Sequence, residues 1–155
     1  MDDKEIEEIM LGMVHKKASE LYSEKVISYG VHPKNYGIID KPDGYASVVN
    51  DCGETLEIYL LIRNGRVEDA KFSTDGCLFT IAAGSAAAAM CVGKTPRECL
   101  MINQGAIMSF LENIPADHAH CAFHAALTFH RALRNYAVTS RNQVRKPKLP
   151  NPIPA

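Results

Sequence analysis

The stretch Asp117–His124 holds three histidines and one cysteine, the densest group of metal-binding side chains in the chain. An apolar pattern of helical period follows it, so His120 and Cys121 should lie one turn from His124 on the same face. A thiolate beside imidazoles suits zinc, copper(I), or iron with sulfide. Two or three side chains do not complete a tetrahedral site, so we expect other parts of the chain to supply the remaining ligands.

Five cysteines are spread along the chain, and none belongs to a C-x-x-C pair. They are Cys52, Cys77, Cys91, Cys99 and Cys121. This spacing excludes a zinc ribbon and a ferredoxin with its ligands in one local run. In a reducing cytoplasm such cysteines act as ligands, nucleophiles or core residues rather than in disulfides. Cys91 and Cys99 fall in helical patterns without supporting glycine or charge, and we predict that both are small buried residues.

The other three cysteines fall at the ends of predicted elements, where ligands are usually placed. Cys52 precedes a glycine that allows a tight turn, which can present Cys52 and Glu54 toward the same point. Cys77 lies between a strand and a helix, where free amide donors and the helix dipole favour a thiolate. Cys121 lies in the first turn of a helix. We therefore predict a joint metal or sulfur site made by these three cysteines with Glu54 and His120.

The remaining histidines give weaker signals. His118 and His124 are as compatible with surface or supporting positions as with ligation. His130 lies more than one turn from Cys121, which predicts a structural position.

Three strand patterns precede the helical half of the chain, over residues 45–51, 54–63 and 66–74. Residues 54–63 alternate apolar and polar side chains, as in a half-buried strand. The apolar set is Leu56, Ile58, Leu60 and Ile62. Asn64-Gly65 predicts a type I′ hairpin turn, because both central residues of that turn need positive φ. We predict an antiparallel meander with one face to be covered by helices.

Helical patterns surround the predicted sheet. They cover residues 1–13, 19–29, 78–92, a short segment after Thr95, 103–111 and 117–137. Thr95-Pro96 begins a capping box with proline at the first helical position, and Gly93 suits the end of the preceding helix. Asp117 is a reasonable N-cap residue for the last helix. The apolar stripe of residues 1–13 predicts a surface helix packed on the body.

The composition is that of one ordinary globular domain: 155 residues, 46% hydrophobic and 23% charged. A net charge of −1 gives no case for a nucleic-acid or membrane partner. The longest apolar run, residues 80–92, is shorter than the roughly 20 residues of a membrane span. The acidic N-terminus is unlike a secretory signal, so we expect a cytoplasmic protein. We divide the chain into an N-terminal helical extension (1–17), one domain (18–137) and a flexible, basic, proline-rich tail (138–155).

Several separated motifs together resemble the IscU/NifU N-terminal family of iron–sulfur cluster scaffold proteins. The motifs are Leu21–Ile27, Pro33-x-Asn35-x-Gly37, Cys52-Gly53-Glu54, Asp69–Phe72, Gly76-Cys77, Gly93-Lys94-Thr95 and His120-Cys121. The resemblance runs from about residue 18 to residue 136. It implies an α+β fold of the IscU/SufE-like type, a three-stranded antiparallel sheet with helices packed on one face.

The resemblance also implies a function. Cys52, Cys77 and Cys121, with His120 or Glu54, would hold a nascent [2Fe–2S] cluster, with zinc on the same ligands in the cluster-free form. A cysteine desulfurase would deliver sulfur as a persulfide on Cys121. The cluster built with iron would then pass to recipient apoproteins. Such a protein is a scaffold rather than an enzyme. The sequence leaves the oligomeric state open, with a homodimer among the partners considered.

Two departures from the family pattern change what we expect. Glu54 stands where the family has aspartate, so its carboxylate reaches one methylene further. Ile114–His118 replaces the segment that bacterial relatives present to a specialised Hsp70 chaperone, so we do not expect that partner. The main alternative is a zinc-bound sulfur-transfer protein in which Cys121 relays persulfide without cluster assembly. A module with structural zinc is another, whereas a hydrolytic zinc enzyme is disfavoured by the three cysteines and by the lack of an H-E-x-x-H helix.

Overall fold

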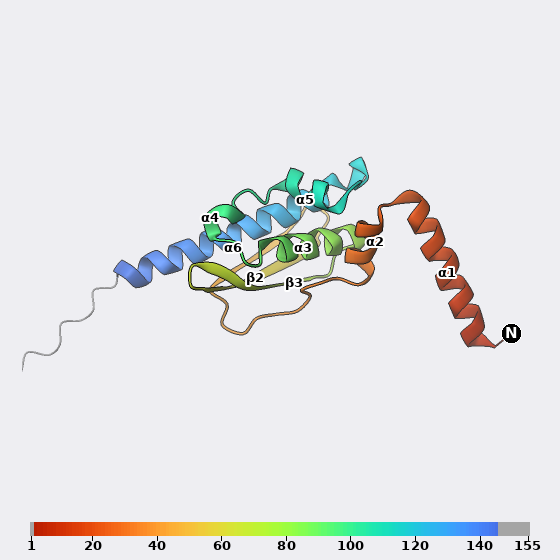
Figure 1. The fold of residues 1–155 in the computed structure, drawn as a ribbon, viewed down its shortest axis with the longest axis horizontal. Helices are drawn as coiled ribbons and strands as arrows, with labels where there is room; N and C mark the ends of the chain where they lie inside the picture. The colour runs from red at the N-terminus through yellow and green to blue at the C-terminus, as the bar shows by residue number, and fades with distance from the viewer. Residues whose placement is uncertain (1, 146–155) are drawn as a thin grey trace, which may run out of the picture.

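The structure is a computed structural model that describes residues 2–145, without the side chains of residues 15, 17–21 and 143–145. Its sheet has the strand order β1 (Gly44–Val49), β2 (Thr55–Arg63), β3 (Arg66–Thr74), and both neighbouring pairs are antiparallel. Helices cover one face of this sheet (Figure 1). The predicted α+β class and meander are therefore confirmed.

The β2–β3 hairpin follows from the sequence pattern. Asn64 and Gly65 have φ of 53° and 74°, as the predicted type I′ turn requires. The apolar set of β2, from Leu56 to Ile62, is buried at alternate positions as predicted. A β-bulge beyond Leu61 shifts the register on β3, and it allows Val67 and Ala70, three residues apart, to be buried on the same face.

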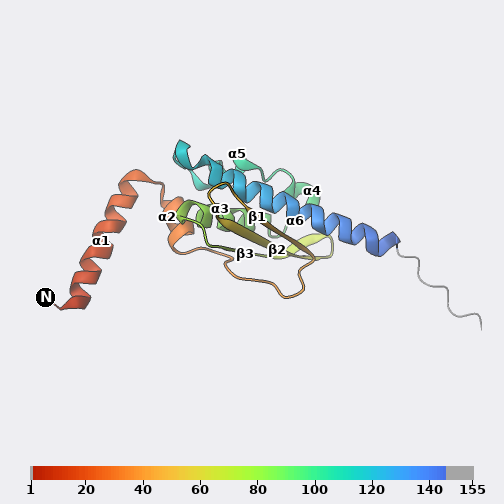
Figure 2. The ribbon, with the colours of Figure 1, turned by 180° about the vertical axis from the view of Figure 1, so that it is seen from behind.

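Two helices form the layer on the sheet, and the shorter helices complete it. α3 (Leu78–Cys91) packs on β3 and β2, while α6 (Ala119–Arg145) packs on β1 and β2, beside α3. Figure 2 shows α6 running the length of the body behind β1. The other segments are α2 (Glu24–Val31), α4 (Pro96–Cys99), α5 (Gln104–Leu111) and the 3₁₀ turn η1 (Ala116–His118). α2 packs on α3, and α5 packs on both α3 and α6.

α3 approaches the sheet closely because its inner residues are small. A Cβ added at Gly84 would lie 2.8 Å from the Phe72 ring and 3.2 Å from Leu56. Phe72 and Leu56 are both fully buried under the helix. Cys77 is the N-cap of α3, so this packing fixes the position from which Cys77 extends.

α6 is fixed along β1 by one close approach and two hydrogen bonds. A Cβ added at Gly44 would lie 2.6 Å from the carbonyl oxygen of Ala132. The Tyr45 N–H donates to Asn135 Oδ1 at 3.0 Å, and His124 Nε2 lies 2.7 Å from the Val48 carbonyl oxygen. These contacts along β1 set the position of the first turn of α6, which carries Cys121.

The N-terminal helix differs from the prediction in length and in packing. α1 runs from Asp3 to Leu21, and α2 then begins after Ser23, whose Oγ accepts a hydrogen bond from the Val26 N–H at 3.1 Å. The predicted break before residue 19 was wrong because Ser23 supplies the N-cap. α1 projects from the body (Figure 1), and its apolar stripe is exposed rather than packed.

The last helix is also longer than predicted. α6 continues to Arg145, so residues 138–145, assigned to the tail, are helical. No proline or glycine occurs between Ala119 and Arg145 to end the helix earlier. Asp117 lies within η1 rather than at an N-cap, so that prediction was wrong too. The rest of the predicted tail, 146–155, lies outside the described residues.

Within residues 2–145, no helix combines the length and the apolar character needed to span a membrane.

Candidate metal centre

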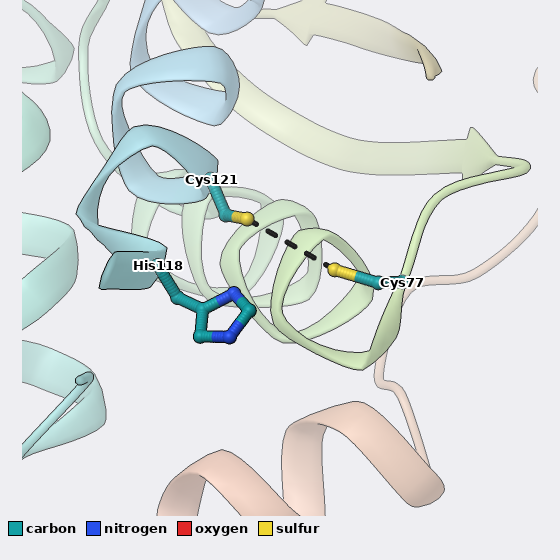
Figure 3. Close-up of side chains that lie close together, drawn as sticks. All are labelled: Cys77, His118 and Cys121. Carbon is teal, nitrogen blue, oxygen red and sulfur yellow. Dashed lines mark hydrogen bonds between the residues drawn. The ribbon is translucent and has the colours of Figure 1, made fainter. Parts of the chain in front are cut away.

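Two thiols meet where the N-termini of α3 and α6 lie side by side. The Sγ atoms of Cys77 and Cys121 are 4.0 Å apart and point toward each other (Figure 3). Cys77 is exposed, whereas Cys121 is fully buried. Two thiolates bound to one zinc ion at about 2.3 Å each lie about 3.8 Å apart, so this pair needs little adjustment to share a metal ion.

His118 from η1 completes a group of three ligands. One ligand atom each from Cys77, His118 and Cys121 lies within 4.8 Å of the other two. The His118 ring stacks on Phe79 with ring centroids 3.9 Å apart. Its Nδ1 atom is buried without a hydrogen-bond partner in the structure. A buried nitrogen with no partner is costly unless something binds it, and a metal ion would.

The predicted ligand His120 lies next to this group. Its Nε2 atom is 3.6 Å from Cys121 Sγ, and its ring centroid is 6.0 Å from that of His118. The His120 side chain is exposed, so it can swing toward or away from the sulfur. The sequence favoured His120 over His118 because only His120 adjoins Cys121. The 3₁₀ turn before α6 is what brings His118 back to the thiols.

Glu54, the other predicted ligand, already has several partners. Its Oε1 accepts the Cys77 N–H at 3.1 Å, and its Oε2 accepts the Thr80 hydroxyl at 2.9 Å and the Asn50 amide at 3.3 Å. Partial burial raises the pKa of the Glu54 carboxyl, but these three hydrogen bonds outweigh burial, so the net pKa is lowered. The carboxylate is therefore charged and directed at the N-terminus of α3.

Cys52 lies in the turn between β1 and β2, two residues before Glu54. Asn50 Oδ1 accepts the N–H groups of Cys52 and Glu54 at 3.0 and 2.9 Å, and Gly53 has φ of 80°. Cys52 is exposed and, with His120, lines a mainly apolar hollow of about 370 Å³ between β1 and α6. Cys52 is thus outside the three-ligand group that the structure brings together.

His124 is a supporting residue. Its Nε2 is 2.7 Å from the Val48 carbonyl oxygen, which can only accept, so Nε2 carries the proton. Nδ1 then accepts from the Asn50 amide at 3.3 Å. With both ring nitrogens engaged, His124 is not available to a metal ion. Its position next to Asn50 links α6 to the turn that carries Cys52.

Asn50 and Thr80 are site residues that the sequence reasoning missed. Asn50 connects His124, Glu54 and the Cys52 N–H, while Thr80 holds the Glu54 carboxylate and lies 3.6 Å from Cys77 Sγ. An Asn at the end of a strand just before a glycine turn is the available signal for Asn50, because Asn side chains often bond backbone N–H groups two residues on.

The predictions for the other two cysteines and for His130 are confirmed. Cys91 and Cys99 are fully buried, and burial raises the pKa of both thiols, that of Cys99 to about 11. His130 Nε2 bonds the Ile102 carbonyl oxygen at 2.8 Å, which is a structural position.

Cys121 is chemically distinct from these two because it adjoins other ligands. Burial and, to a smaller extent, the neighbouring Cys77 and Glu54 raise the pKa of its thiol to about 12, although a hydrogen bond with Thr80 lowers it. The metal-free site therefore holds a protonated Cys121. A metal ion must displace that proton, since only the thiolate is a ligand.

Comparison with known proteins gives consistent results. The family model of the NifU-like N-terminal domain matches residues 21–143. An iron–sulfur cluster assembly scaffold protein IscU of Archaeoglobus fulgidus is 38% identical over 117 residues, covering 75% of this chain and 76% of its own. The IscU of Haemophilus influenzae is 33% identical over 120 residues, covering 74% of this chain and 94% of its own.

Solved structures share the fold. A candidate iron–sulfur scaffold of the SUF system from Fervidobacterium islandicum superposes with a TM-score of 0.62 at 25% identity, covering 74% of this chain and 97% of that one. The N-terminal part of a NifU-like protein from Brucella abortus has a TM-score of 0.61 at 23% identity, covering 76% and 95%.

Proposed function

Because the chain belongs to the family of NifU-like N-terminal domains, we propose that it is a scaffold on which an iron–sulfur cluster is assembled and then passed to apoproteins. The observation that carries this proposal is the approach of Cys77 and Cys121 to 4.0 Å, at the N-termini of two helices and beside His118. Soft thiolates with one weaker ligand suit iron with sulfide.

The proposed cluster ligands are Cys52, Cys77 and Cys121 with one weaker fourth ligand. Cys52 is exposed on a turn beside His120, so it can reach the cluster from the side of the hollow. Glu54 and His120 are the fourth ligands expected from the sequence, and the unpartnered His118 nitrogen adds a third candidate. The bonds that Glu54 already makes favour a histidine for this position.

We propose a cysteine desulfurase as the sulfur donor and Cys121 as the acceptor. The Cys121 thiol gives its proton to His120, whose Nε2 lies 3.6 Å from Cys121 Sγ. The thiolate then attacks the terminal sulfur of the donor persulfide, a new S–S bond forms on Cys121, and the donor leaves as a thiolate. Cys121 is fully buried, so transfer requires that His118 or His120 move aside. The proposed cargo is a [2Fe–2S] cluster, and the free cysteines fit a reducing cytoplasm.

A zinc-bound persulfide relay is the second candidate function. The observation that favours it is the Cys77, His118 and Cys121 group, whose donor set and spacing suit tetrahedral zinc with one open position. In this role zinc remains bound, and Cys121 passes sulfur on without cluster assembly.

Anaerobic reconstitution with ferrous iron, cysteine and a cysteine desulfurase separates the two functions. The scaffold is expected to develop visible sulfur-to-iron absorption together with acid-labile sulfide. Tight stoichiometric zinc without that absorption would instead identify the relay.

A further inference from the structure

α1 presents an apolar stripe that no other described part of the chain covers. Ile6, Ile9, Met10 and Met13 recur at helical spacing, and between 41% and 67% of each side chain is exposed. Acidic residues lie around this stripe: residues 2–14 contain five aspartates and glutamates and one lysine. Four large apolar residues exposed together on one face, over about two turns, form an unusual surface for a free helix.

α6 presents a surface of complementary character, which we call its outer stripe. The outer stripe consists of Phe123, Leu127, Arg131, Arg134 and Val138, spaced three or four residues apart on one helix face. Phe123 is 54% exposed and Val138 is 48% exposed. The whole of α6 contains four arginines and no aspartate or glutamate. Its outer stripe also continues into the hollow lined by Phe123, Leu127, His120 and Cys52.

The start of α2, just beyond the end of α1, is anchored on the body of the protein. The Tyr22 ring packs edge-on against Phe79, with centroids 5.1 Å apart, and Ser23 Oγ donates to the Leu111 carbonyl oxygen at 2.5 Å. Figures 1 and 2 both show α1 leaving the body in a direction away from α6. In this arrangement the acidic apolar helix of one chain is placed to meet the basic apolar stripe of a second copy rather than that of its own chain.

We propose that α1 of one copy docks on the outer stripe of α6 in a second copy, and that the reciprocal contact closes a symmetric dimer. The apolar side chains of α1 cover Phe123, Leu127 and Val138, while the acidic residues face Arg131 and Arg134. Complementary charge of this kind selects the partner and its orientation. The docked helix also covers the hollow beside Cys52 and His120, so the second copy shields the metal site.

The test is the mass of the full-length protein in solution, by light scattering and sedimentation. The wild type is expected at twice the 17.0 kDa of one chain. Ile9→Glu with Met13→Glu on α1, and Arg131→Glu with Arg134→Glu on α6, should each weaken the dimer by roughly tenfold or more. None of these four side chains is buried in the core, so circular dichroism should show an unchanged fold.

The matched controls make the same kinds of substitution, an apolar residue or an arginine to glutamate, outside the proposed interface. Leu11→Glu places a new acid on α1 away from the stripe, and Arg97→Glu reverses an exposed charge on α4, which belongs to neither α1 nor the outer stripe. Both should keep the wild-type mass. Mixing the α1 variant with the α6 variant should restore one of the two contacts and give a heterodimer that neither forms alone.

A wild type that stays monomeric would overturn the proposal, because α1 would then be free or folded back on its own chain. A dimer that persists in both double variants would also overturn it, because another surface would hold the copies together. Cluster reconstitution has no part in this measurement, so its result is independent of the proposed function.

Discussion

The Glu54 carboxylate accepts a hydrogen bond from the backbone N–H of Cys77, at 3.1 Å, and so joins the turn after β1 to the N-terminus of α3. The Cys77 side chain makes no capping bond of its own. Glu54 thus acts as a capping residue from the distant turn between β1 and β2, and it leaves the Cys77 sulfur free to face Cys121.

Glu54→Gln should lower stability more than it lowers metal affinity. The amide keeps the shape but loses the charge-assisted bonds, at a cost of about 1 kcal/mol at this partly exposed position. Because the pKa of Glu54 is lowered by folding, its stabilisation is present above the ordinary carboxyl pKa and is lost as the pH falls through the lowered value. Urea unfolding should therefore separate wild type from variant at neutral pH and not in acid. Loss of metal with unchanged stability would make Glu54 a ligand instead.

His118→Ala should weaken zinc binding by about tenfold or more, and His120→Ala should weaken it less. The reason is that His118 belongs to the group within 4.8 Å, whereas His120 is exposed beside it. Competition with a chromophoric chelator measures both affinities. A larger loss of zinc affinity in His120→Ala than in His118→Ala would instead identify His120 as the ligand.

Alanine in place of Cys52, Cys77 or Cys121 should abolish a stable cluster after anaerobic reconstitution, because each change removes one of the proposed thiolates. Cys99→Ala is the matched control, since Cys99 is buried away from the site. That variant should keep the cluster and lose about 1 kcal/mol of stability. Visible absorption and sulfide content report the result, and full cluster retention in all three site variants would exclude this assignment.

Zinc affinity should rise with pH between about pH 6 and pH 8. Burial holds the pKa of Cys121 at about 12, so the thiol enters the reaction protonated and each bound zinc ion releases its proton. Proton release can be titrated in weakly buffered solution. Cys121→Ser should lower it by about one proton per zinc ion, and an unchanged proton count would show that Cys121 does not bind the metal.

Gly44→Ala should destabilise the protein by about 2 kcal/mol, since the new methyl group would lie 2.6 Å from the Ala132 carbonyl oxygen. Gly105→Ala is the control: it lies in α5, where the nearest atom to a new Cβ is 3.5 Å away. Alanine favours a helix over glycine, so this variant should be neutral or slightly more stable. Equal losses from both changes would contradict the close approach of α6 to β1.

The sheet could be predicted from the sequence because its signals are local. Alternation in β2 and the Asn64-Gly65 turn depend only on neighbouring residues, and both are confirmed. The length of α6 was underestimated because the polar residues after Tyr136 suggested a tail, although nothing there ends a helix. The packing of α1 could not be known, because an apolar stripe does not show whether a surface exists to receive it.

Part of the candidate site could also be predicted from local signals in the sequence. Cys77 and Cys121 were found because each lies at the start of a helix, and these thiols do meet. The place of His118 depends on the 3₁₀ turn, and the engagement of Glu54 depends on Thr80 and Asn50, which lie far apart in the sequence. Such side-chain partners arise only when β2, α3 and the turn are assembled.

The contact of Gly84 with Phe72 also sets the axial register of α3. If the helix slid by one turn along the sheet, a residue with a Cβ would stand over the Phe72 ring. Gly84 is two turns from Cys77, or about 10 Å along the axis. Gly84 therefore fixes the position of the Cys77 sulfur along the helix axis, although Gly84 does not contact that sulfur. Selection for altered metal affinity can accordingly be expected to find changes at this position as well as at the ligands.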